Sequence, residues 1–517
     1  MTTGRSTHGR GRSGYAGRGA AVVLAGVAAV VMSVAPAGAA PSGAVSPAAG
    51  IISTVAGGTE GPGPAAGIAI SPCGLKSDGN ELYIADWVNG GVIRAVNERT
   101  GRLTTPAGVA VGGYDGNGRR ATDTELWDPC SAALDGAGNL VITDIGPPAP
   151  AGTVNNWVRV AAARTGTFYG HAMKAGRLYT IAAGQCDFYE GYATFCPADA
   201  EPDHQGNLVI ADTGGADDHS MTTKPALVRV LAGSSGTFYG QKMTVGHMYI
   251  VAGGADGFSG DGGPAVGAGL GLSISTVRVD SVGNLVIANN GTGRIRVVAA
   301  ATGTFYGQAM KAGDIYTVAG GGEATGNGVP ATSAAISVGG VANDAAGNLV
   351  ITDTSGLVRV VAETTGTFYG QPMTAGDIYT VAGNGKTGYS GDGGPALKAE
   401  FDYPQSVAVD SAGNLVIDDT VNNRVRVVAA ATGTFYGQAM KAGDIYTAAG
   451  DGVNTGLGFS GDGVAAVKAL LGSPSGVAAD RAGDIAIADG LSGRVRLVAA
   501  GTRTLFGQPM KAGDIYT

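Results

Sequence analysis

Ionisable residues are scarce in this sequence. Asp, Glu, Lys and Arg make up 14% of the chain, with only five histidines and four cysteines among 517 residues. So few histidines leave little material for a multi-histidine metal centre or a Ser-His-Asp triad. The formal net charge of −8 provides no excess of cations for a nucleic-acid surface. After residue 34 no apolar stretch is long enough to span a membrane. We therefore expect no nucleic-acid partner, no stable membrane insertion, and neither metal nor cofactor.

The first 39 residues have the features of a secretory signal peptide. Four arginines and no acidic residue precede an apolar stretch at 20–34, and Ala37-Gly38-Ala39 follows as an A-x-A cleavage site. The sequence thus predicts a signal peptide at 1–39, a short linker at 40–50 and a secreted, extracellular protein, which we expect to be monomeric.

One short phrase of the form G-N-L-V-I-x-D recurs through the remainder of the chain. Its seven copies end at Asp86, Asp144, Asp212, Asn289, Asp353, Asp419 and Asp489. Each unit contains four β-branched runs bounded by Gly, Asn and Asp; in the sixth unit they cover 406–410, 414–419, 424–429 and 444–450. No unit has a helical period long enough for a crossover. This pattern predicts an all-β protein, a β-propeller of seven four-stranded blades over 51–517, with six or eight blades as alternatives.

The repeat unit resembles a known family. Pro404–Val428 reads P-x-x-V-A-V-D-x-x-G-N-L-V-I-x-D and continues to N-R-V-R-V-V, which is similar to the NHL-repeat β-propellers. The resemblance covers about residues 51–517. It implies a propeller fold but leaves the function open, because family members include ligand-binding sensors, protein scaffolds and RNA-binding domains, and related propellers include lactonases and lyases.

Several repeated charged residues have a structural interpretation. An Asp ends the first strand of every unit and is followed in most by x-x-Gly-Asn, which is typical of a type I turn and argues against a ring of metal ligands. An Arg recurs in every third strand, where we expect it to bind backbone carbonyls or an acid between blades. The loop GFSGDGGPA at 257–265 has one carboxylate per copy, so a turn is favoured over a calcium site.

The four cysteines allow three disulfide connectivities. Cys73 and Cys130 each follow a proline at equivalent places in successive units, and Cys186 and Cys196 lie ten residues apart. In an oxidising compartment these positions predict the pairs Cys73–Cys130 and Cys186–Cys196, with free thiols as the alternative. A zinc site is disfavoured because no C-x-x-C spacing occurs.

A second phrase, GTFYGQAMKAGDIYT, occurs at 303–317 and again unchanged at 433–447, with near-copies in other units. It reads as a hairpin between the third and fourth strands. We expect its Tyr and Met to shield the exposed outer edge of the blade, the alternative being a peripheral ring of aromatic binding sites, for example for glycan. Ring closure stays open, because both residues 51–57 and the C-terminal DIYT at 514–517 resemble a fourth strand.

The candidate ligand site lies on the first strands, next to the central axis. Two residues before the repeated Asp, four units have Ala, whereas the others have Lys76, Glu201 and Arg278. Strand alternation gives these three one facing, and we expect that facing to be the channel. Two interpretations follow: an ion pair that fills the axis, or a polar floor for a small anionic or zwitterionic ligand.

The histidines do not form an obvious catalytic set. They fall in a turn, an insertion in the third unit and different points of the hairpin phrase. The predicted function is therefore a secreted, non-catalytic module that binds an extracellular ligand, such as a cell-wall glycan, peptide or protein. The alternative is a propeller lyase or lactonase-like hydrolase with a site at the channel near the third blade.

Overall fold

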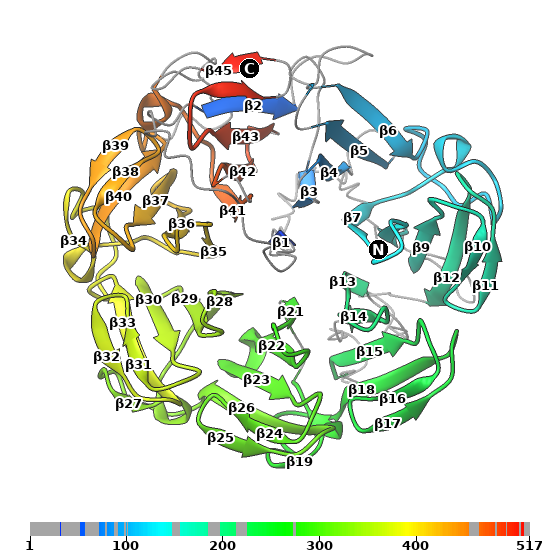
Figure 1. The fold of residues 1–517 in the computed structure, drawn as a ribbon, viewed down its shortest axis with the longest axis horizontal. Coiled ribbons are helices and arrows are strands. Elements are labelled where there is room, and N and C mark those ends of the chain that lie inside the picture. Colours follow the sequence, from blue (N-terminus) through cyan, green and yellow to red (C-terminus); the bar gives the residue numbers. More distant parts are fainter. Residues whose placement is uncertain are drawn as a thin grey trace, which may run out of the picture.

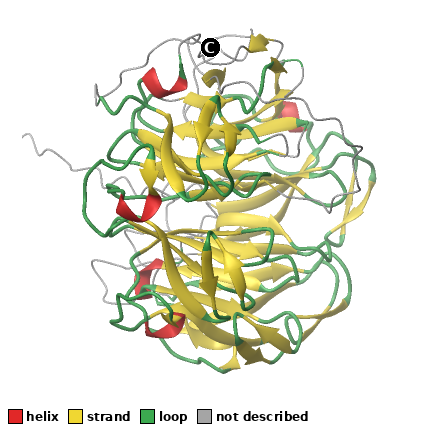
Figure 2. Cartoon of the chain, turned by 60° about the vertical axis from the view of Figure 1, so that its left-hand side comes forward, coloured by secondary structure: helices red, strands yellow, loops and turns green. Residues whose placement is uncertain are grey.

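Seven sheets form a ring around a central axis (Figure 1). The computed structural model describes residues 31–32, 52–56, 72–77, 80–86, 91–97, 100, 102–146, 156–184, 197–212, 225–271, 274, 276–453, 465–480, 483–492, 494–505 and 508–510. Within these ranges the helices are 3₁₀ segments of three residues, and strands make up the rest of the regular structure (Figure 2). The prediction of an all-β, seven-bladed propeller is confirmed, and the alternatives of six or eight blades are wrong.

Blade 6 shows how the sequence forms one unit. Its strands are β35 (Val407–Val409), β36 (Leu415–Asp419), β37 (Arg424–Val428) and β40 (Asp444–Ala449), which pair as an antiparallel meander with β35 innermost. These strands consist largely of Val, Ile and Ala, which suit a sheet buried on both faces between neighbouring blades. All five residues of β36 are buried.

The other blades repeat this order from the axis outward. Blade 1 contains β3 (Pro72–Ser77), β4 (Glu81–Asp86), β5 (Val92–Asn97) and β6 (Leu103–Ala107). Blade 2 contains β7 (Pro129–Leu134), β8 (Leu140–Ile145), β9 (Asn156–Ala161) and β12 (Leu178–Gly184). Blade 3 contains β13 (Pro197–Pro202), β14 (Leu208–Asp212), β15 (Leu227–Leu231) and β18 (Met248–Ala255), with β20 (Val266–Gly269) parallel to β18. Blade 4 contains β21 (Thr276–Val279), β22 (Leu285–Asn289), β23 (Arg294–Val298) and β26 (Asp314–Gly320). Blade 5 contains β28 (Val338–Asn343), β29 (Leu349–Asp353), β30 (Leu357–Val361) and β33 (Asp377–Ala382).

Blade 7 is built from both ends of the sequence. Its inner strands are β41 (Pro474–Ala479), β42 (Ile485–Asp489) and β43 (Arg494–Val498), and its outer strand is β2 (Ile52–Ala56). β2 runs antiparallel to β43, with Ile52 opposite Val498 (Figure 1). Of the two segments that resemble a fourth strand, the N-terminal one therefore closes the ring. The C-terminal DIYT lies outside the described residues.

A two-residue strand, β1 (Val31–Met32), lies beside β3 on the inner side of the ring (Figure 1). It pairs in parallel with Lys76 and Ser77. Because β1 falls within the predicted signal peptide, cleavage after Ala39 would remove it and leave blade 1 with its four strands.

Apolar side chains fill the spaces between blades. One cluster joins Val286 and Ile295 of blade 4 to Leu349 and Ile351 of blade 5, all of them fully buried. Each such side chain contributes about 1.5–3 kcal/mol of transfer free energy. The ring is therefore held by a series of similar cores between blades, in keeping with the repeated sequence.

The long repeated phrase forms a hairpin on each of six blades. In blade 4 its strands are β24 (Gly303–Phe305) and β25 (Gln308–Met310), joined by Tyr306-Gly307. Both turn residues have positive φ, +49° and +71°, as a type I′ turn requires. The other hairpins are β10 (Gly166–Phe168) with β11 (His171–Met173), β16 (Gly236–Phe238) with β17 (Gln241–Met243), β31 (Gly366–Phe368) with β32 (Gln371–Met373), β38 (Gly433–Phe435) with β39 (Gln438–Met440), and β44 (Arg503–Leu505) with β45 (Gln508–Met510).

In five of the six hairpins the turn tyrosine anchors the hairpin to the innermost turn of its own blade. The Tyr306 hydroxyl donates to Asp280 Oδ2 at 3.1 Å, while Asp280 Oδ1 accepts from the backbone N–H of Val282 and Asn284. Asp280 is the repeated residue predicted to form a type I turn, and these bonds confirm that role. The same bond joins four further pairs: Tyr169–Asp135, Tyr239–Asp203, Tyr369–Asp344 and Tyr436–Asp410.

The hairpin tip also contacts the next blade. A Cβ on Gly307 would lie 2.7 Å from the carbonyl oxygen of Ala375, and the backbone N–H of Tyr306 donates to Glu363 Oε2 at 2.6 Å. Ala375 and Glu363 both belong to blade 5. Corresponding contacts occur at Gly170 and Gly240 but not at Gly370, so the hairpins of blades 2, 3 and 4 connect neighbouring blades.

The outer edge is not protected as predicted. In blades 4, 5 and 6 a two-residue strand from the preceding loop pairs with the outermost strand: β19 (Gly263–Pro264) with β26, β27 (Val329–Pro330) with β33, and β34 (Gly394–Pro395) with β40. Proline suits this place because it cannot donate to a further strand. In these blades the glycine-rich loop pairs with the backbone edge of the outermost strand, whereas the hairpin contributes buried Tyr and Met side chains to the core, as Tyr306 and Met310 do in blade 4.

The disulfide predictions fall largely outside the described side chains. Cys186 and Cys196 lie in an undescribed segment, and only the backbone of Cys73 is described. Cys130 lies on β7 with intermediate exposure. β3 and β7 are the innermost strands of neighbouring blades, which is compatible with the pair Cys73–Cys130. Because the partner side chains are not described, both Cys73–Cys130 and Cys186–Cys196 stay predictions.

Candidate functional site

The structure brings Lys76, Glu201 and Arg278 into one charged cluster on the innermost strands. Arg278 Nη1 lies 3.7 Å from Glu201 Oε2, and Lys76 Nζ lies 3.8 Å from Asp199 Oδ1. β3, β13 and β21 supply these residues, so the cluster extends from blade 1 to blade 4. Asp199, two residues before Glu201, is a member that the sequence reasoning missed.

The cluster faces the axis. Lys76 of blade 1 reaches Asp199 of blade 3, although blade 2 lies between them. Blade 2 has two small residues here, Ser131 and Ala133, and the Ser131 hydroxyl donates to Asp199 Oδ1 at 2.9 Å. Lys76 and Asp199 can meet across blade 2 only if both side chains point toward the axis, which agrees with the predicted orientation.

Burial dominates the electrostatics of this cluster. Lys76 and Arg278 are 8% and 9% exposed. Burial raises the pKa of Glu201 above its ordinary value, and the nearby charges of Lys76 and Arg278 oppose this rise. Lys76 Nζ, Glu201 Oε2 and Arg278 Nη1 make no hydrogen bond to any residue that the structure describes. These three atoms therefore retain hydrogen-bonding capacity inside the ring.

The repeated arginines of the third strands are structural, as predicted. Arg296 is fully buried, and its Nη atoms donate to the carbonyl oxygens of Gly269 and Ser259 and to Asp261 Oδ1. Arg426 makes the corresponding bonds to Glu400, Ser390 and Asp392. Each arginine thus holds the loop that enters its own blade, and the loop carboxylate is its partner. Among the described residues no group of three His, Cys, Asp or Glu side chains is arranged to hold a metal.

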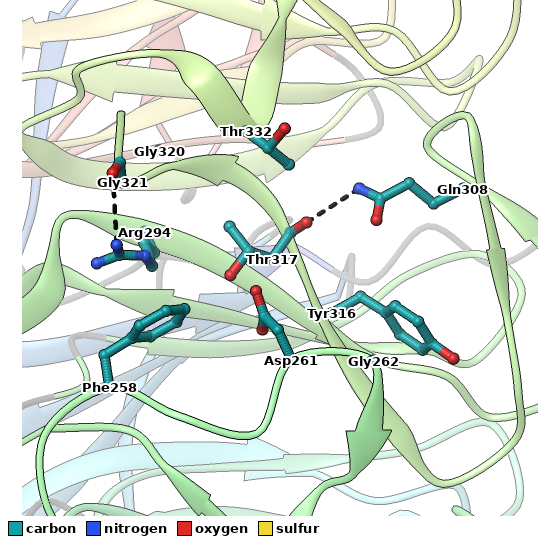
Figure 3. Close-up of a pocket in the computed structure, with 10 residues that line it drawn as sticks. All are labelled: Phe258, Asp261, Gly262, Arg294, Gln308, Tyr316, Thr317, Gly320, Gly321 and Thr332. Atoms are coloured by element: carbon teal, nitrogen blue, oxygen red, sulfur yellow. Dashed lines mark hydrogen bonds between the residues drawn. The ribbon is translucent and has the colours of Figure 1, made fainter. Parts of the chain in front are cut away.

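A second concave site lies at the outer rim of blade 4. It is a pocket of about 400 Å³ (Figure 3). Its lining residues are Phe258, Asp261, Gly262, Arg294, Gln308, Tyr316, Thr317, Gly320, Gly321 and Thr332. Phe258 is 40% exposed, and the Arg294 guanidinium carbon lies 3.8 Å from its ring centroid. The pocket forms where the glycine-rich loop meets the hairpin phrase, two motifs that the sequence shows separately but does not place together.

The histidines do not assemble within the described chain. His171 lies on β11 of blade 2, and His247 lies beside β18 of blade 3, where its Nδ1 is 3.2 Å from the Val245 carbonyl oxygen. His204 occupies the turn after β13, and His219 lies outside the described residues. No helix in the described part is long and apolar enough to cross a membrane.

The chain is similar to several proteins of known structure. A streptogramin B lyase matches at TM-score 0.44 and 10% identity, covering 87% of this chain and 97% of that one. A virginiamycin B lyase from Staphylococcus aureus matches at TM-score 0.43 and 9% identity, covering 84% and 97%. An auxiliary nutrient-binding protein from Bacteroides thetaiotaomicron matches at 0.40 and 12%, covering 80% and 84%. No family model matches the sequence, and no curated protein matches it either. At this level of similarity no activity is transferred.

Proposed function

We propose that this chain is a secreted, NHL-like propeller that binds a small extracellular ligand at its axis without transforming it chemically. The observation that supports the proposal is the buried cluster of Lys76, Asp199, Glu201 and Arg278. Buried polar atoms normally have a hydrogen-bond partner, and an unpaired one costs about 1–3 kcal/mol. A ligand that supplies these partners would recover that free energy.

The charges favour a zwitterionic or anionic ligand. Lys76 Nζ and Arg278 Nη1 are donors for a carboxylate or phosphate, and Glu201 Oε2 is an acceptor for an ammonium or hydroxyl group. The segment β1 lies on β3 at Lys76, so removal of the signal peptide would uncover this side of the cluster. The mature chain is accordingly the form expected to bind.

The lyase or lactonase alternative is not favoured. Such chemistry requires a general acid or base positioned against a nucleophile or metal. Among the described residues of blade 3, His204 is near enough to Glu201 to affect its pKa, but no metal-binding group accompanies the two. The repeated Asp, Arg and hairpin residues stabilise the ring, which fits a binding module.

Isothermal titration of the mature protein with short peptides, free amino acids and phosphorylated sugars tests the proposal. For any probe that binds, Arg278→Ala should weaken affinity at least about tenfold, equivalent to about 1.4 kcal/mol. Because this change removes the cation paired with the buried Glu201 and leaves only Lys76 nearby, the double variant Glu201→Gln/Arg278→Met is measured in parallel, together with melting temperatures. Arg119→Ala, which changes an exposed side chain outside the cluster in the loop before β7, is the control. Unchanged affinity in both cluster variants, or the absence of binding by every probe, would show that the cluster only fills the axis.

A further inference from the structure

The rim pocket of blade 4 has counterparts in other blades, and the comparison shows what it lacks. In blade 6, Tyr389 occupies the place of Phe258. Its hydroxyl donates to Asp392 Oδ2 at 2.9 Å and lies 3.2 Å from Thr447 Oγ1. In blade 2, the Tyr114 hydroxyl lies 3.3 Å from Thr180 Oγ1 in the same way. A phenol hydroxyl therefore satisfies the outer-strand threonine in both of these blades.

Blade 4 keeps the threonine but has lost that hydroxyl. Thr317 corresponds to Thr447, since each is paired with the repeated arginine of its blade. Thr317 is 7% exposed, and its Oγ1 has no hydrogen-bond partner among the described residues. Phe258 has the aromatic ring of Tyr389 but not its hydroxyl group. A buried hydroxyl without a partner therefore borders the pocket.

The carboxylate on the other side of the gap is in place. Asp261 Oδ1 accepts from Arg296 Nη2 at 2.6 Å, as Asp392 Oδ1 accepts from Arg426 Nη2 at 2.8 Å. By this correspondence Asp261 Oδ2 is the atom that would accept from a tyrosine hydroxyl. Figure 3 shows the Phe258 ring pointing toward Thr317 and Asp261 across this gap.

The surroundings indicate the class of ligand. Gln308 lines the pocket with its amide, whose Nε2 donates to the Thr317 carbonyl oxygen at 2.9 Å, leaving the amide oxygen as a further acceptor. Tyr316 and the guanidinium of Arg294 complete a lining of aromatic and planar polar groups. The volume of about 400 Å³ is far more than the roughly 30 Å³ that one water occupies and lies within the range of small-molecule sites.

We propose that this pocket binds a sugar, one hydroxyl of which makes the hydrogen bonds that the tyrosine hydroxyl makes in blade 6 once the exposed Phe258 ring has turned aside. That hydroxyl would donate to Asp261 Oδ2 and interact with Thr317 Oγ1, while other hydroxyls reach Gln308 and Arg294. The site is separate from the axial cluster, because it lies at the outer strand of blade 4 and shares no residue with it.

Blades 5 and 6 support the assignment. Blade 5 has Ala324 in place of Phe258 and Leu357 in place of Arg294, so the aromatic ring and the arginine are absent together. Blade 6 keeps the stacked pair, with the Arg424 guanidinium 3.7 Å from the Tyr389 ring centroid. The stack therefore belongs to the loop architecture, whereas the absence of the hydroxyl, which leaves Thr317 Oγ1 without a partner among the described residues, distinguishes blade 4 from blades 2 and 6. The sequence has phenylalanine again at Phe459, outside the described residues.

The test replaces the missing hydroxyl. Phe258→Tyr should fold with unchanged or higher stability, because its hydroxyl gains Thr317 and Asp261 as partners, and it should lose sugar binding by about tenfold or more. Tyr389→Phe is the reciprocal variant and should create a second site in blade 6. Phe459→Tyr, measured separately, reports any contribution from the last unit.

Saturation-transfer NMR with glucose, galactose, mannose and N-acetylglucosamine measures binding of free sugars, and sedimentation with insoluble chitin and peptidoglycan measures binding to polymers. Binding that Phe258→Tyr weakens and Glu201→Gln/Arg278→Met leaves intact supports the proposal, and the two assays distinguish a free sugar from a polymer. Absence of binding to every sugar and polymer would overturn it. Equal binding by wild type and Phe258→Tyr would overturn it as well.

Discussion

Asp418 allows a test of whether a carboxyl group buried in a blade is protonated in the folded protein. It lies on β36, where the other units have Ala or Thr, and it is completely buried. Its Oδ1 accepts from the backbone N–H of Gln405 at 2.9 Å and of Ser406 at 2.5 Å. Burial, assisted by the neighbouring Asp419, raises the pKa of Asp418 to about 8. The folded protein therefore keeps a proton on this group at neutral pH.

The sign of the pH dependence follows from this raised pKa. In the unfolded chain the group titrates near its ordinary value of about 3.9. Between about pH 4 and pH 8 the folded state holds a proton that the unfolded state has released, so the free energy of unfolding falls as pH rises. One group contributes at most about 1.4 kcal/mol per pH unit, or on the order of 4 kcal/mol between pH 5 and pH 8.

Asp418→Asn should remove this dependence. Asparagine has the shape of the protonated acid and keeps the Oδ1 acceptor, so we expect the variant to gain stability over wild type progressively from pH 5 to pH 8. Denaturant unfolding at each pH measures the difference, with Asp256→Asn, at an exposed loop position, as the control. Parallel pH profiles for Asp418→Asn and wild type would refute the argument, because they would mean that Asp418 is ionised in the fold.

Two further predictions concern the connections between blades. Gly307→Ala should destabilise the protein more than Gly370→Ala by about 1–3 kcal/mol: both have positive φ, but only at Gly307 does the added Cβ meet the next blade, while nothing lies within 4 Å at Gly370. Equal melting temperatures for the two variants would contradict the connector role of the hairpin. Peptide mapping of the protein without reduction should recover the pairs Cys73–Cys130 and Cys186–Cys196; any other pairing disproves the prediction.

Much of the fold could be predicted because every unit repeats its strand and turn signals. Closure could not, since residues 52–56 and the final DIYT have the same strand character, and only the pairing with β43 distinguishes them. The role of the hairpin was also hidden. Tyr306 and Asp280 are both repeated, yet a repeated pair of residues does not show that one side chain reaches the other across the blade.

The sites were predictable only in part. Glu201 and Arg278 share one register on neighbouring blades, so their contact follows from strand alignment. Asp199 could not be found this way, because it meets Lys76 only where the small side chains of blade 2 leave room. The gap at Phe258 was invisible as well, since exchange of Tyr for Phe acquires meaning only once Thr317 is known to face the missing hydroxyl.

The pairing of β2 with β43 has a consequence for folding during synthesis. β2 emerges near the start of translation, whereas its partner is among the last segments to appear. Until then β2 has no neighbour on the side that β43 will occupy, and the nascent ring stays open at both flanks. Folding of the seam therefore depends on contacts of very high sequence separation, which form slowly. A chain that stops before β43 loses its last blade and also leaves its first outer strand unpaired.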